Sequence, residues 1–324
     1  MAEGRGFDAI MGVGKESTWG TAVAATQKVP FISETLSKIF TPIQNPSLVG
    51  VASPRQSDQG VLVADGGFTA MMTYKTRDFA FEQFFGTYTP STTAAPHAYT
   101  LNDTVDNKAL TVAHEKTVSV HEFAGFKPSQ LTVTGTPGDG VQYTMDGMAK
   151  NQSLTSTLNT SAVLSTLAEP ATNIKFHEGV FSLQTVGSTV ALVAYAHSAF
   201  SLTVNRQHEA SEVNSQNRLE PKENNFRESL LSVTLPRHTT DQFQTWHDSH
   251  QKLFGKLKFT DTSTQAHVKE FRLNKLIVEQ APANVDGPGF IAVEVQFRLF
   301  NDLENDNTST EFTFSEEIKL FEST

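Results

Sequence analysis

Apolar and polar side chains alternate along several short segments of the chain, and they do so in both halves. Residues 141–146 read Val-Gln-Tyr-Thr-Met-Asp, and residues 291–298 read Ile-Ala-Val-Glu-Val-Gln-Phe-Arg. Successive side chains of a strand point to opposite faces, so a period of two predicts a strand with one buried and one wet face. Such strands are typical of antiparallel sheets, as in sandwiches and barrels.

The predicted elements follow the same order twice. In each half we expect a strand, a short helix and then two further strands. The segments are residues 68–74, 77–86, 130–135 and 141–146 in the first half, and 229–235, 239–254, 275–279 and 290–297 in the second. This repetition predicts a mainly β protein of two tandem antiparallel β-sandwich or barrel units. It also favours a protein that presents two equivalent surfaces for assembly.

Each predicted helix carries bulky apolar residues that would pack on a sheet. These residues are Phe79, Phe81, Phe84 and Phe85 in the first helix, and Phe243, Trp246 and Phe254 in the second. Core packing is the ordinary role of such side chains. We therefore expect one short amphipathic α-helix in each unit.

Long polar segments interrupt the pattern at the same place in both halves. They cover residues 41–67 and residues 205–225. Unstructured connections of this length are uncommon in compact domains and are usually functional or disordered. Their duplication favours a functional role over that of ordinary surface loops.

The remaining segments set the expected domain boundaries. Residues 1–30 are rich in Gly, Ala and Thr with little periodicity, which indicates an extended N-terminal arm that pairs with something else. Residues 151–173 indicate an inserted linker or a small subdomain. We therefore expect a first unit over residues 1–174, which includes the arm and the first long loop. The second unit, with the other loop, would cover residues 175–324.

Composition narrows the classes of function. The 324 residues include 24 Phe, which pack well on pleated sheets, and the formal net charge is -10. This balance argues against tight duplex binding, which needs Lys and Arg to neutralise phosphates. The chain has no cysteine, so disulfides, thiolate metal sites and Cys nucleophiles are excluded. No signal-like apolar segment and no membrane-length run is present, so we expect a soluble protein without membrane insertion.

No motif in the sequence points to catalysis. Residues 12–17 resemble a phosphate loop, but Ala9 occupies the first Gly position and Glu16 stands where a hydroxyl should bind magnesium. His247 and His250 share a spacing of three, without the further ligands that zinc requires. A Gly-x-Ser-x-Gly elbow is absent. We therefore expect no enzyme activity, no cofactor and no metal site.

The segment from Gly12 to Ala22 reads Gly-Val-Gly-Lys-Glu-Ser-Thr-Trp-Gly-Thr-Ala. It resembles the opening of the major tail tube proteins of long-tailed, siphovirus-type bacteriophages. In that family a Gly-x-x-Lys-Glu-x-x-x-Gly-Thr stretch commonly precedes a strand like residues 29–36 here. A Gly-Gly-Phe strand at Gly66 to Phe68, a Phe-rich helix and a hairpin follow in the family's order. The resemblance covers the N-terminal half best and extends more loosely over the second half.

The resemblance implies a structural virion protein that self-assembles into stacked rings, the tail tube that conducts the genome into the host cell. Relatives with two units per chain form rings of three chains with pseudo-sixfold symmetry, so the duplication favours three chains, with six chains as the rival. The implied partners are other copies of the chain, the tape measure protein, tail terminator and tip proteins, and viral DNA that passes without specific binding. The implied location is the virion tail, after assembly in the host cytoplasm.

Two groups of residues are candidates for this role. The first would face the lumen, because a neutral or acidic wall does not bind a moving duplex; it comprises Gln142, Asp146, Glu294 and Gln296. The second would connect stacked rings from the long loops; it comprises Arg55, Asp58, Glu212, Glu220 and Lys222.

Two alternatives stay open. The first is another ring-forming tail component such as a tail terminator, which makes single rings instead of long tubes. The second is a β-sandwich carbohydrate-binding or adhesin module, which usually exposes aromatic residues on a ligand face. Trp19 and Trp246 are the only tryptophans, which leaves the second alternative weak.

Overall fold

A computed structural model of the whole chain provides the structure. It describes residues 5–44, 53, 57–74, 77–92, 96–169, 172–188, 191–263, 267–285, 287–302, 312 and 314–323. Within these residues the fold is mainly β with antiparallel pairing, as the alternation predicts; of the two expected forms, sandwich or barrel, no closed barrel is formed.

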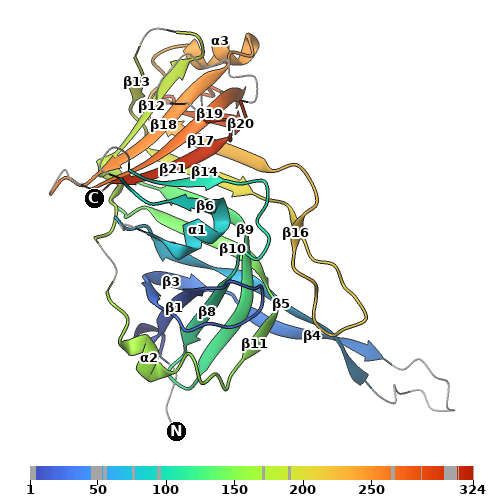
Figure 1. Cartoon of the computed structure of the whole chain (residues 1–324). Helices are drawn as coiled ribbons and strands as arrows, with labels where there is room; N and C mark the ends of the chain where they lie inside the picture. The colour runs from blue at the N-terminus through green and yellow to red at the C-terminus, as the bar shows by residue number, and fades with distance from the viewer. Residues whose placement is uncertain are drawn as a thin grey trace.

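The described strands fall into two sets (Figure 1). The first half holds β1 (Ile10–Lys15), β2 (Gln27–Val29), β3 (Phe31–Glu34), β4 (Ser37–Gln44), β5 (Ser57–Met71), β6 (Gly86–Thr89), β7 (His97–Leu101), β8 (Leu110–Glu115), β9 (Val120–Gly135), β10 (Gln142–Ala149) and β11 (Asn151–Ser153). The second half holds β12 (Gly179–Thr185), β13 (Val193–Tyr195), β14 (Ala199–Asn205), β15 (His208–Glu209), β16 (Lys222–Glu223), β17 (Glu228–Leu235), β18 (Leu253–Thr260), β19 (Val268–Gln280), β20 (Val293–Leu299) and β21 (Ile318–Ser323).

Short helices complete the described elements. The α-helices are α1 (Phe79–Phe85), α2 (Ser161–Ser165) and α3 (Gln242–Asp248), and the 3-10 turns are η1 (Gly6–Asp8) and η2 (Phe176–Glu178). Helices α1 and α3 confirm the expected helix in each unit. Helix α2 belongs to the segment between the units, where it packs Leu164 against Ala25 and Ala113.

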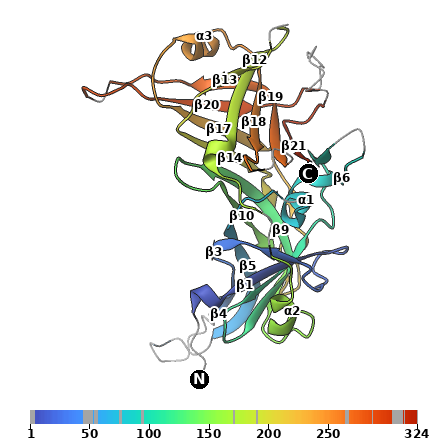
Figure 2. The ribbon, with the colours of Figure 1, turned by 90° about the vertical axis from the view of Figure 1, so that its left-hand side faces the viewer.

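One continuous row of strands crosses both halves. Its order is β4, β5, β10, β9, β14, β17, β20 and β19, so each half contributes four neighbouring strands. Figures 1 and 2 show the halves one above the other, with β9, β10 and β14 between them. A second contact joins β7 of the first half to β21 of the second.

The two halves repeat each other in detail. In the first half, Gly147 lies opposite Pro128 and Asp146 opposite Gln130, so the register shifts by one residue between them. In the second half, Phe297 lies opposite Val278 and Gln296 opposite Gln280, each 150 positions later, with the same shift. The conserved bulge confirms the tandem repeat that the sequence predicts.

Long strands pass from one sheet of each unit to the other. The first part of β9 pairs with β8, while its later part pairs with β10 and β14. In the same way β19 pairs first with β18 and then with β20. Strands β1 and β2 extend the β8 side, and β12 and β13 extend the β18 side. The buried apolar residues of both halves form one contiguous cluster between these layers.

Helix α1 is shorter than the expected 77–86 but packs as predicted. Asp78 caps its N-terminus by accepting a hydrogen bond of 2.9 Å from the Ala80 N–H. Gly86 ends the helix with a φ of 88°, which only glycine adopts readily. Phe81, Phe84 and Phe85 are fully buried, while Phe79 packs at the margin of the apolar cluster. The four phenylalanines predicted to pack on the sheet therefore do so.

The expected second helix over residues 239–254 is too long. Helix α3 covers Gln242–Asp248, and Phe254 belongs to β18. In β18, Leu253, Leu257 and Phe259 are buried at alternate positions, so the sheet ladder with β12 and β19 competes successfully with helix formation. Phe243 is buried beneath α3 and Trp246 packs beside it.

The long loop expected over residues 41–67 is largely a hairpin. Strand β4 continues to Gln44 and β5 begins at Ser57, directly opposite it. Leu62 and Ala64 are buried at alternate positions of β5, so this segment has the period of a strand despite its polar composition.

The N-terminal 30 residues are not an extended arm as a whole. Strand β1 pairs with β8 and β2 within the same chain, and Met11 and Val13 are fully buried. Met11 and Val13 alternate with Gly12 and Gly14, which have no side chain, so the period of two is weak in the sequence. Among the described residues before β2, the η1 turn and the connection over residues 16–26 lie outside the sheet.

A polar sheet face as the candidate functional site

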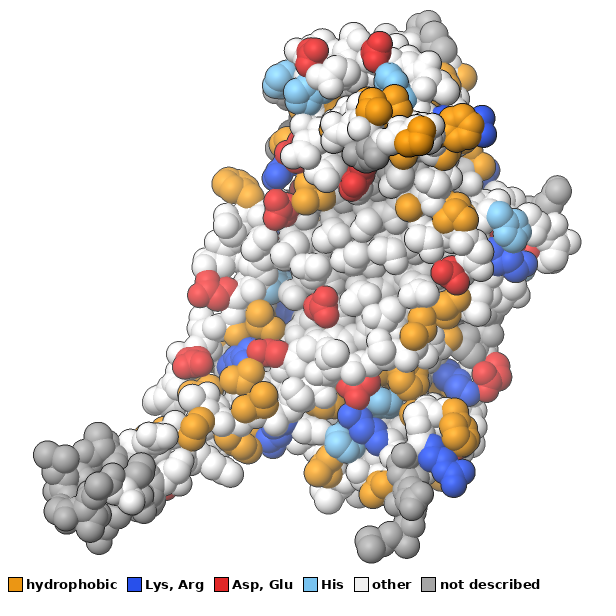
Figure 3. All heavy atoms as spheres, turned by 180° about the vertical axis from the view of Figure 1, so that it is seen from behind, with side chains coloured by type: hydrophobic (Ala, Val, Ile, Leu, Met, Phe, Trp, Pro, Cys, Tyr) orange, Lys and Arg blue, Asp and Glu red, His pale blue; other side chains and the backbone are white. Residues whose placement is uncertain are grey.

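The candidate functional site is the solvent-facing side of the six middle strands, β5, β10, β9, β14, β17 and β20. Buried and partly exposed residues alternate along these strands, so one face packs in the core and the other meets solvent. We call the solvent-facing side the polar face. Its residues include Thr69, Gln130, Thr132, Thr134, Gln142, Thr144, Asp146, Ser201, Thr203, Asn205, Ser232, Thr234, Glu294 and Gln296. Figure 3 shows the molecule from behind, with a broad central area in which a few acidic side chains lie among uncharged surface.

One row of the polar face crosses five strands in register. Gln142 lies opposite Thr134, Thr134 opposite Ser201, Ser201 opposite Ser232, and Ser232 opposite Gln296. Side chains directly opposite each other on one face are close enough to interact. Residues predicted as functional in opposite halves therefore belong to one surface.

A neighbouring row is formed by threonines. The hydroxyl oxygens of Thr69 and Thr144 are 2.9 Å apart, and those of Thr132 and Thr203 are 3.3 Å apart. The second pair bridges β9 and β14, where the two halves meet. These hydroxyl groups satisfy one another across the strands, which leaves a smooth surface without long mobile side chains.

The few charges on this face are mainly acidic. Asp146 and Glu228 occupy one row, and Glu294 accepts a hydrogen bond of 2.7 Å from the Ser232 hydroxyl. Partial burial raises the pKa of Asp146 above its usual range. The cation Arg298 is 3.4 Å from Glu228, so its charge is balanced by a carboxylate on the same face.

The structure places all four predicted lumen residues on the polar face. Gln142 and Asp146 lie on β10, and Glu294 and Gln296 lie on β20. Asp146 also comes close to Gly67, where any Cβ atom would lie 2.2 Å from a carboxylate oxygen. The threonine rows belong to the same surface, and the period-two pattern of β9 and β14 could have identified them.

The segment at residues 205–225 lies along the first half of the same chain. Lys127 pairs with Glu220 at 2.7 Å, and Arg218 donates two hydrogen bonds to Asp65, at 2.9 and 2.8 Å. In addition, the Leu62 N–H donates to the carbonyl of Gln216. This segment therefore contacts β5 and β9 over a long stretch (Figure 1).

The predicted stacking residues have different surroundings. Glu220 contacts Lys127, and Lys222 lies 3.3 Å from Asp106, so both contact the first half of their own chain. Glu212 is exposed, and Asp58 is an exposed residue of β5. Arg55 lies outside the described residues.

Sequence reasoning missed the residue that fixes the start of this segment. Arg206 is fully buried, forms an ion pair of 2.6 Å with Glu223 and donates a hydrogen bond of 2.8 Å to the Phe84 carbonyl. It also donates to the Asn102 carbonyl. Burial lowers the pKa of Arg206 to about 10, although the carboxylate of Glu223 opposes this effect. An arginine in a polar segment carries no sequence signal for such a role.

The motif that carries the family resemblance has a structural role. Glu16 is buried and accepts hydrogen bonds of 2.7 Å from the N–H groups of Gly20 and Gly125 and from the Thr111 hydroxyl. Burial raises the pKa of Glu16 despite these bonds. Gly20 has a φ of 74°, where other residues are strained. The Glu and the Gly of the motif thus hold the connection after β1 against β9.

Features expected of other kinds of site are not found in the described residues. No group of three or more His, Asp or Glu there could hold a metal ion, and the side chain of His247 is bonded to its neighbour Asp248. In the same part of the chain, no helix is long and apolar enough to cross a membrane.

The fold and the polar face define a structural β protein that joins two copies of one unit into a continuous sheet. A family profile described as phage tail tube protein matches residues 6–299. The chain therefore belongs to the phage tail tube protein family and is a structural component of the virion tail. The predicted resemblance is confirmed, and it extends over nearly the whole chain. A search of curated protein sequences gave no match.

Proposed function

We propose that three copies of this chain close into a ring, that rings stack into a tail tube, and that the polar face lines the channel. The observation that carries the proposal is the pairing of β9 with β14, because it joins two equivalent units edge to edge within one chain. Repetition of this joint between chains would continue the same sheet around a ring.

The repeat identifies the strands that would form the joint between chains. Strand β19 is the counterpart of β9, and β4 is the counterpart of β14. Gln130 lies opposite Asn205 in the internal joint. Their counterparts are Gln280 of one copy and Ile39 of the next, so we expect these two residues to face each other.

Both of these edges are available in the single chain. Among the described residues, β4 pairs only with β5, and β19 beyond Leu276 pairs only with β20. The β4 edge carries exposed apolar residues, since Ile39 is 61% exposed and Ile43 is 57% exposed. An open strand edge with apolar side chains is a natural site for pairing with another chain.

The duplication supports the number of copies. Each chain supplies two equivalent units, so three chains supply the six units of a pseudo-sixfold ring. The interfaces are head to tail, and such heterologous contacts close only when the rotation per step fits the ring. A ring of six chains would need twice as many units and is the rival outcome.

The polar face suits the wall of a DNA channel. Helix α1 contacts β9 and helix α3 contacts β19 from the core side, opposite to the polar face. A ring with the helices outside therefore turns the Thr, Ser and Gln rows inward. Few cations lie on this face, so the phosphates of a duplex would find few fixed partners and could slide.

The proposal includes partners at the ends and between rings. The tape measure protein would occupy the lumen before DNA, and terminator and tip proteins would cover the ends of a tube assembled in the host cytoplasm. Between rings, we retain the β4–β5 hairpin with Asp58, and the segment with Glu212, as contacts. Glu220 and Lys222 would act in stacking only through the segment that they fix to the first half.

Electron microscopy of the purified protein tests the assembly directly. We expect tubes whose end-on views show six lobes, and a ring mass of three chains by light scattering. Single rings would indicate a terminator, and rings of six chains would contradict the trimer.

A variant tests the joint. Ile39→Asp places a charge on the β4 edge and should leave folded chains that form no rings. Val180→Asp on β12 is the matched control, because Val180 is 49% exposed but lies away from both edges. Normal tubes from Ile39→Asp would overturn the proposed joint.

A further inference from the structure

His208 is a buried histidine near the start of the segment at residues 205–225, which we call the strap. It lies on β15 and is 8% exposed. Both ring nitrogens are shielded from solvent, and neither makes a hydrogen bond of normal geometry with the described residues. A buried polar group without such bonds is unusual in a folded protein. The polar face and the proposed strand joint do not use this residue.

Cations among the described residues surround the His208 ring. Arg206 precedes it on the strap, Lys127 lies on β9, and Arg227 follows the strap, and each of them disfavours a positive charge on the ring. Glu223 lies directly opposite His208 in the β15–β16 pair, but it already binds Arg206 at 2.6 Å and Arg227 at 3.3 Å. A proton on the ring would therefore add a further positive charge to a place that already holds three.

The other carboxylates near these cations are also paired. Glu220 of the strap binds Lys127 at 2.7 Å. Asp103 binds Arg227 at 2.6 Å, and Glu317, which precedes β21, lies 3.5 Å from the same guanidinium group. These pairs hold the strap on the first half while the His208 ring is neutral. A charged ring would compete with the cations for the same carboxylates.

The surroundings of the ring make closure of the strap depend on pH. Burial and the neighbouring cations lower the pKa of His208 to about 3, although the nearby Pro128 carbonyl opposes this effect. An imidazole in solvent has its ordinary pKa of 6.5, so the opened strap binds a proton at a higher pH than the closed strap does. The closed state keeps its full stability above pH 6.5 and loses stability as the pH falls toward 3. Acid therefore favours opening.

We propose that protonation of His208 in mild acid releases the strap from the first half of the chain. The charged ring is repelled by its cationic neighbours, and opening of the strap lets water solvate it. Opening frees the Leu62 N–H, which donates to the Gln216 carbonyl at 2.8 Å, and separates Arg218 from Asp65. Leu62 and Asp65 lie on β5, so release of the strap exposes part of this strand. The switch acts within one chain and does not depend on the ring.

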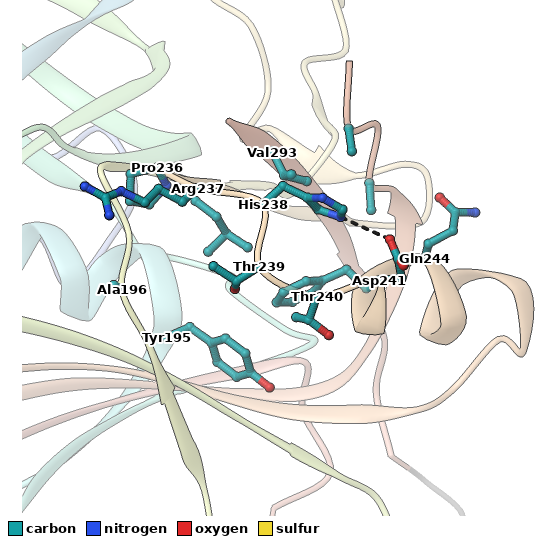
Figure 4. A pocket seen from close by; sticks show the side chains of 14 residues that line it. Tyr195, Ala196, Pro236, Arg237, His238, Thr239, Thr240, Asp241, Gln244 and Val293 are labelled. Carbon is teal, nitrogen blue, oxygen red and sulfur yellow. Dashed lines mark ion pairs between the residues drawn. The ribbon is translucent and has the colours of Figure 1, made fainter. Parts of the chain in front are cut away.

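Another histidine has the opposite surroundings. His238 lies at the rim of an apolar pocket of about 410 Å³ beside α3, and its imidazole is 3.1 Å from the Asp241 carboxylate (Figure 4). Its side chain is 29% exposed, so a positive charge on this ring would face water and a carboxylate. Replacement of His238 therefore removes a histidine from the chain without changing the charges around the strap, and it provides the matched control.

Hydrogen exchange of the Leu62 N–H measures opening of the strap, because this group is bonded to the Gln216 carbonyl. Mass spectrometry of the full chain gives its exchange rate from pH 7.5 to pH 5, corrected for the chemical exchange rate at each pH. We expect the opening constant to rise about 30-fold, since each pH unit below the ordinary pKa of 6.5 changes it about tenfold. His208→Gln should remove this rise, and His238→Gln should retain it. The carboxylates are the same in both variants, so the difference belongs to His208.

Equal rises in the natural chain and in His208→Gln would overturn the switch, as would a natural chain whose opening constant does not change. If His208→Gln already opens the strap at pH 7.5, the titration of the ring in the natural chain decides. Exchange of the imidazole Cε1 hydrogen, followed by mass spectrometry, gives the titration midpoint of each histidine. We expect a midpoint for His208 well below 6.5. An ordinary midpoint near 6.5 would overturn the proposal.

Discussion

Lys269 is a cation of the second half that is buried against the first. It forms an ion pair with Glu322, and its ammonium group lies 4.7 Å from the centre of the Phe81 ring on α1. The Tyr99 hydroxyl also donates to Glu322, at 2.9 Å. This small cluster connects β19, β21, β7 and α1, so it couples the folding of the two halves.

Removal of this cation should destabilise the whole chain. We expect Lys269→Met to lower the free energy of unfolding by about 3 to 5 kcal/mol, because it leaves the Glu322 carboxylate buried without its partner. Urea denaturation of the unassembled chain measures the effect. Lys258→Met on the more exposed face of β18 is the control and should cost less than about 1 kcal/mol. Equal losses in the two variants would contradict this role.

Glu34 at the end of β3 gives a dependence on pH. Burial alone would raise its pKa, but hydrogen bonds from His114 and Lys116 outweigh burial and lower the pKa to about 2. A lowered carboxyl pKa stabilises the fold above the unfolded value of 4.5, and this stability is lost as the pH falls toward 2. The loss is on the order of 3 kcal/mol.

The variant Glu34→Gln should remove this part of the acid sensitivity. We expect it to be less stable than the natural chain at pH 7 and to approach it in stability near pH 2 to 3. Urea midpoints of both proteins at pH 7, 4.5 and 3 provide the comparison. A constant difference over this range would show that Glu34 does not titrate as proposed.

At this scale the sequence predicts apolar contacts better than polar ones. The spacing of Phe81, Phe84 and Phe85 is enough to identify a buried helix face. Lys269 and Glu322 are 53 positions apart on different strands, and no local pattern relates them. Buried ion pairs depend on which strands become neighbours, and that information is absent from a single segment.

Among the elements, the segment between β14 and β17 differs most from its predicted character. It belongs to a long polar stretch, yet ionic contacts fix it to the first half. Arg218 of the segment binds Asp65, Glu220 binds Lys127 of β9, and Arg206 binds the Phe84 carbonyl. Ionic partners replace the apolar contacts that normally order a chain segment. Its counterpart in the first half is the β4–β5 hairpin, which this segment itself contacts through Asp65 and Leu62 of β5.

Release of this segment should follow from a single substitution. Arg206→Met removes the hydrogen bonds to the Phe84 and Asn102 carbonyls and the ion pair with Glu223. We expect at least about a tenfold increase in tryptic cleavage after Arg218 or Lys222, because local opening becomes cheaper by more than about 1.4 kcal/mol. Arg237→Lys, near Phe290, is the control and should cleave at the natural rate. An unchanged rate for Arg206→Met would contradict its role.

Element type was predictable wherever the period of two was long and uninterrupted, as in β10 and β20. Boundaries failed where two structures competed, as at residues 249–254, where the end of α3 gives way to β18. Residues 57–67 are also part of a strand although their sequence is mostly polar, because one face of that hairpin meets solvent. The polar face followed from the same period, but its continuity across β9 and β14 required the strand order.

At the scale of the molecule, the polar face has an electrostatic consequence. Glu294→Lys with Gln296→Lys would place two cations per chain on the channel wall of the proposed tube. Both residues lie on β20 with at least partial exposure, so we expect the variant to fold and to form tubes of normal appearance. The added cations should make those tubes retain linear DNA at low salt and release it as salt rises.

Measurement of DNA bound to sedimented tubes at several salt concentrations checks this expectation, and loss of infectivity would accompany it in a phage. Val180→Lys, on β12, adds a cation away from the polar face and serves as the control. Equal retention of DNA by the natural and the double-variant tubes would place the polar face outside the channel.

The internal joint between β9 and β14 also bears on how assembly depends on protein concentration. In the proposed ring, three of the six joints form when each chain folds and are independent of protein concentration. Only three joints require encounters between molecules, so the equilibrium between free chains and closed rings depends on the third power of the concentration of free chains, where six separate units would give the sixth power. Covalent linkage of two units acts as a high local concentration of one for the other. Tube growth could thus begin at a protein concentration where separate single units would still be dispersed.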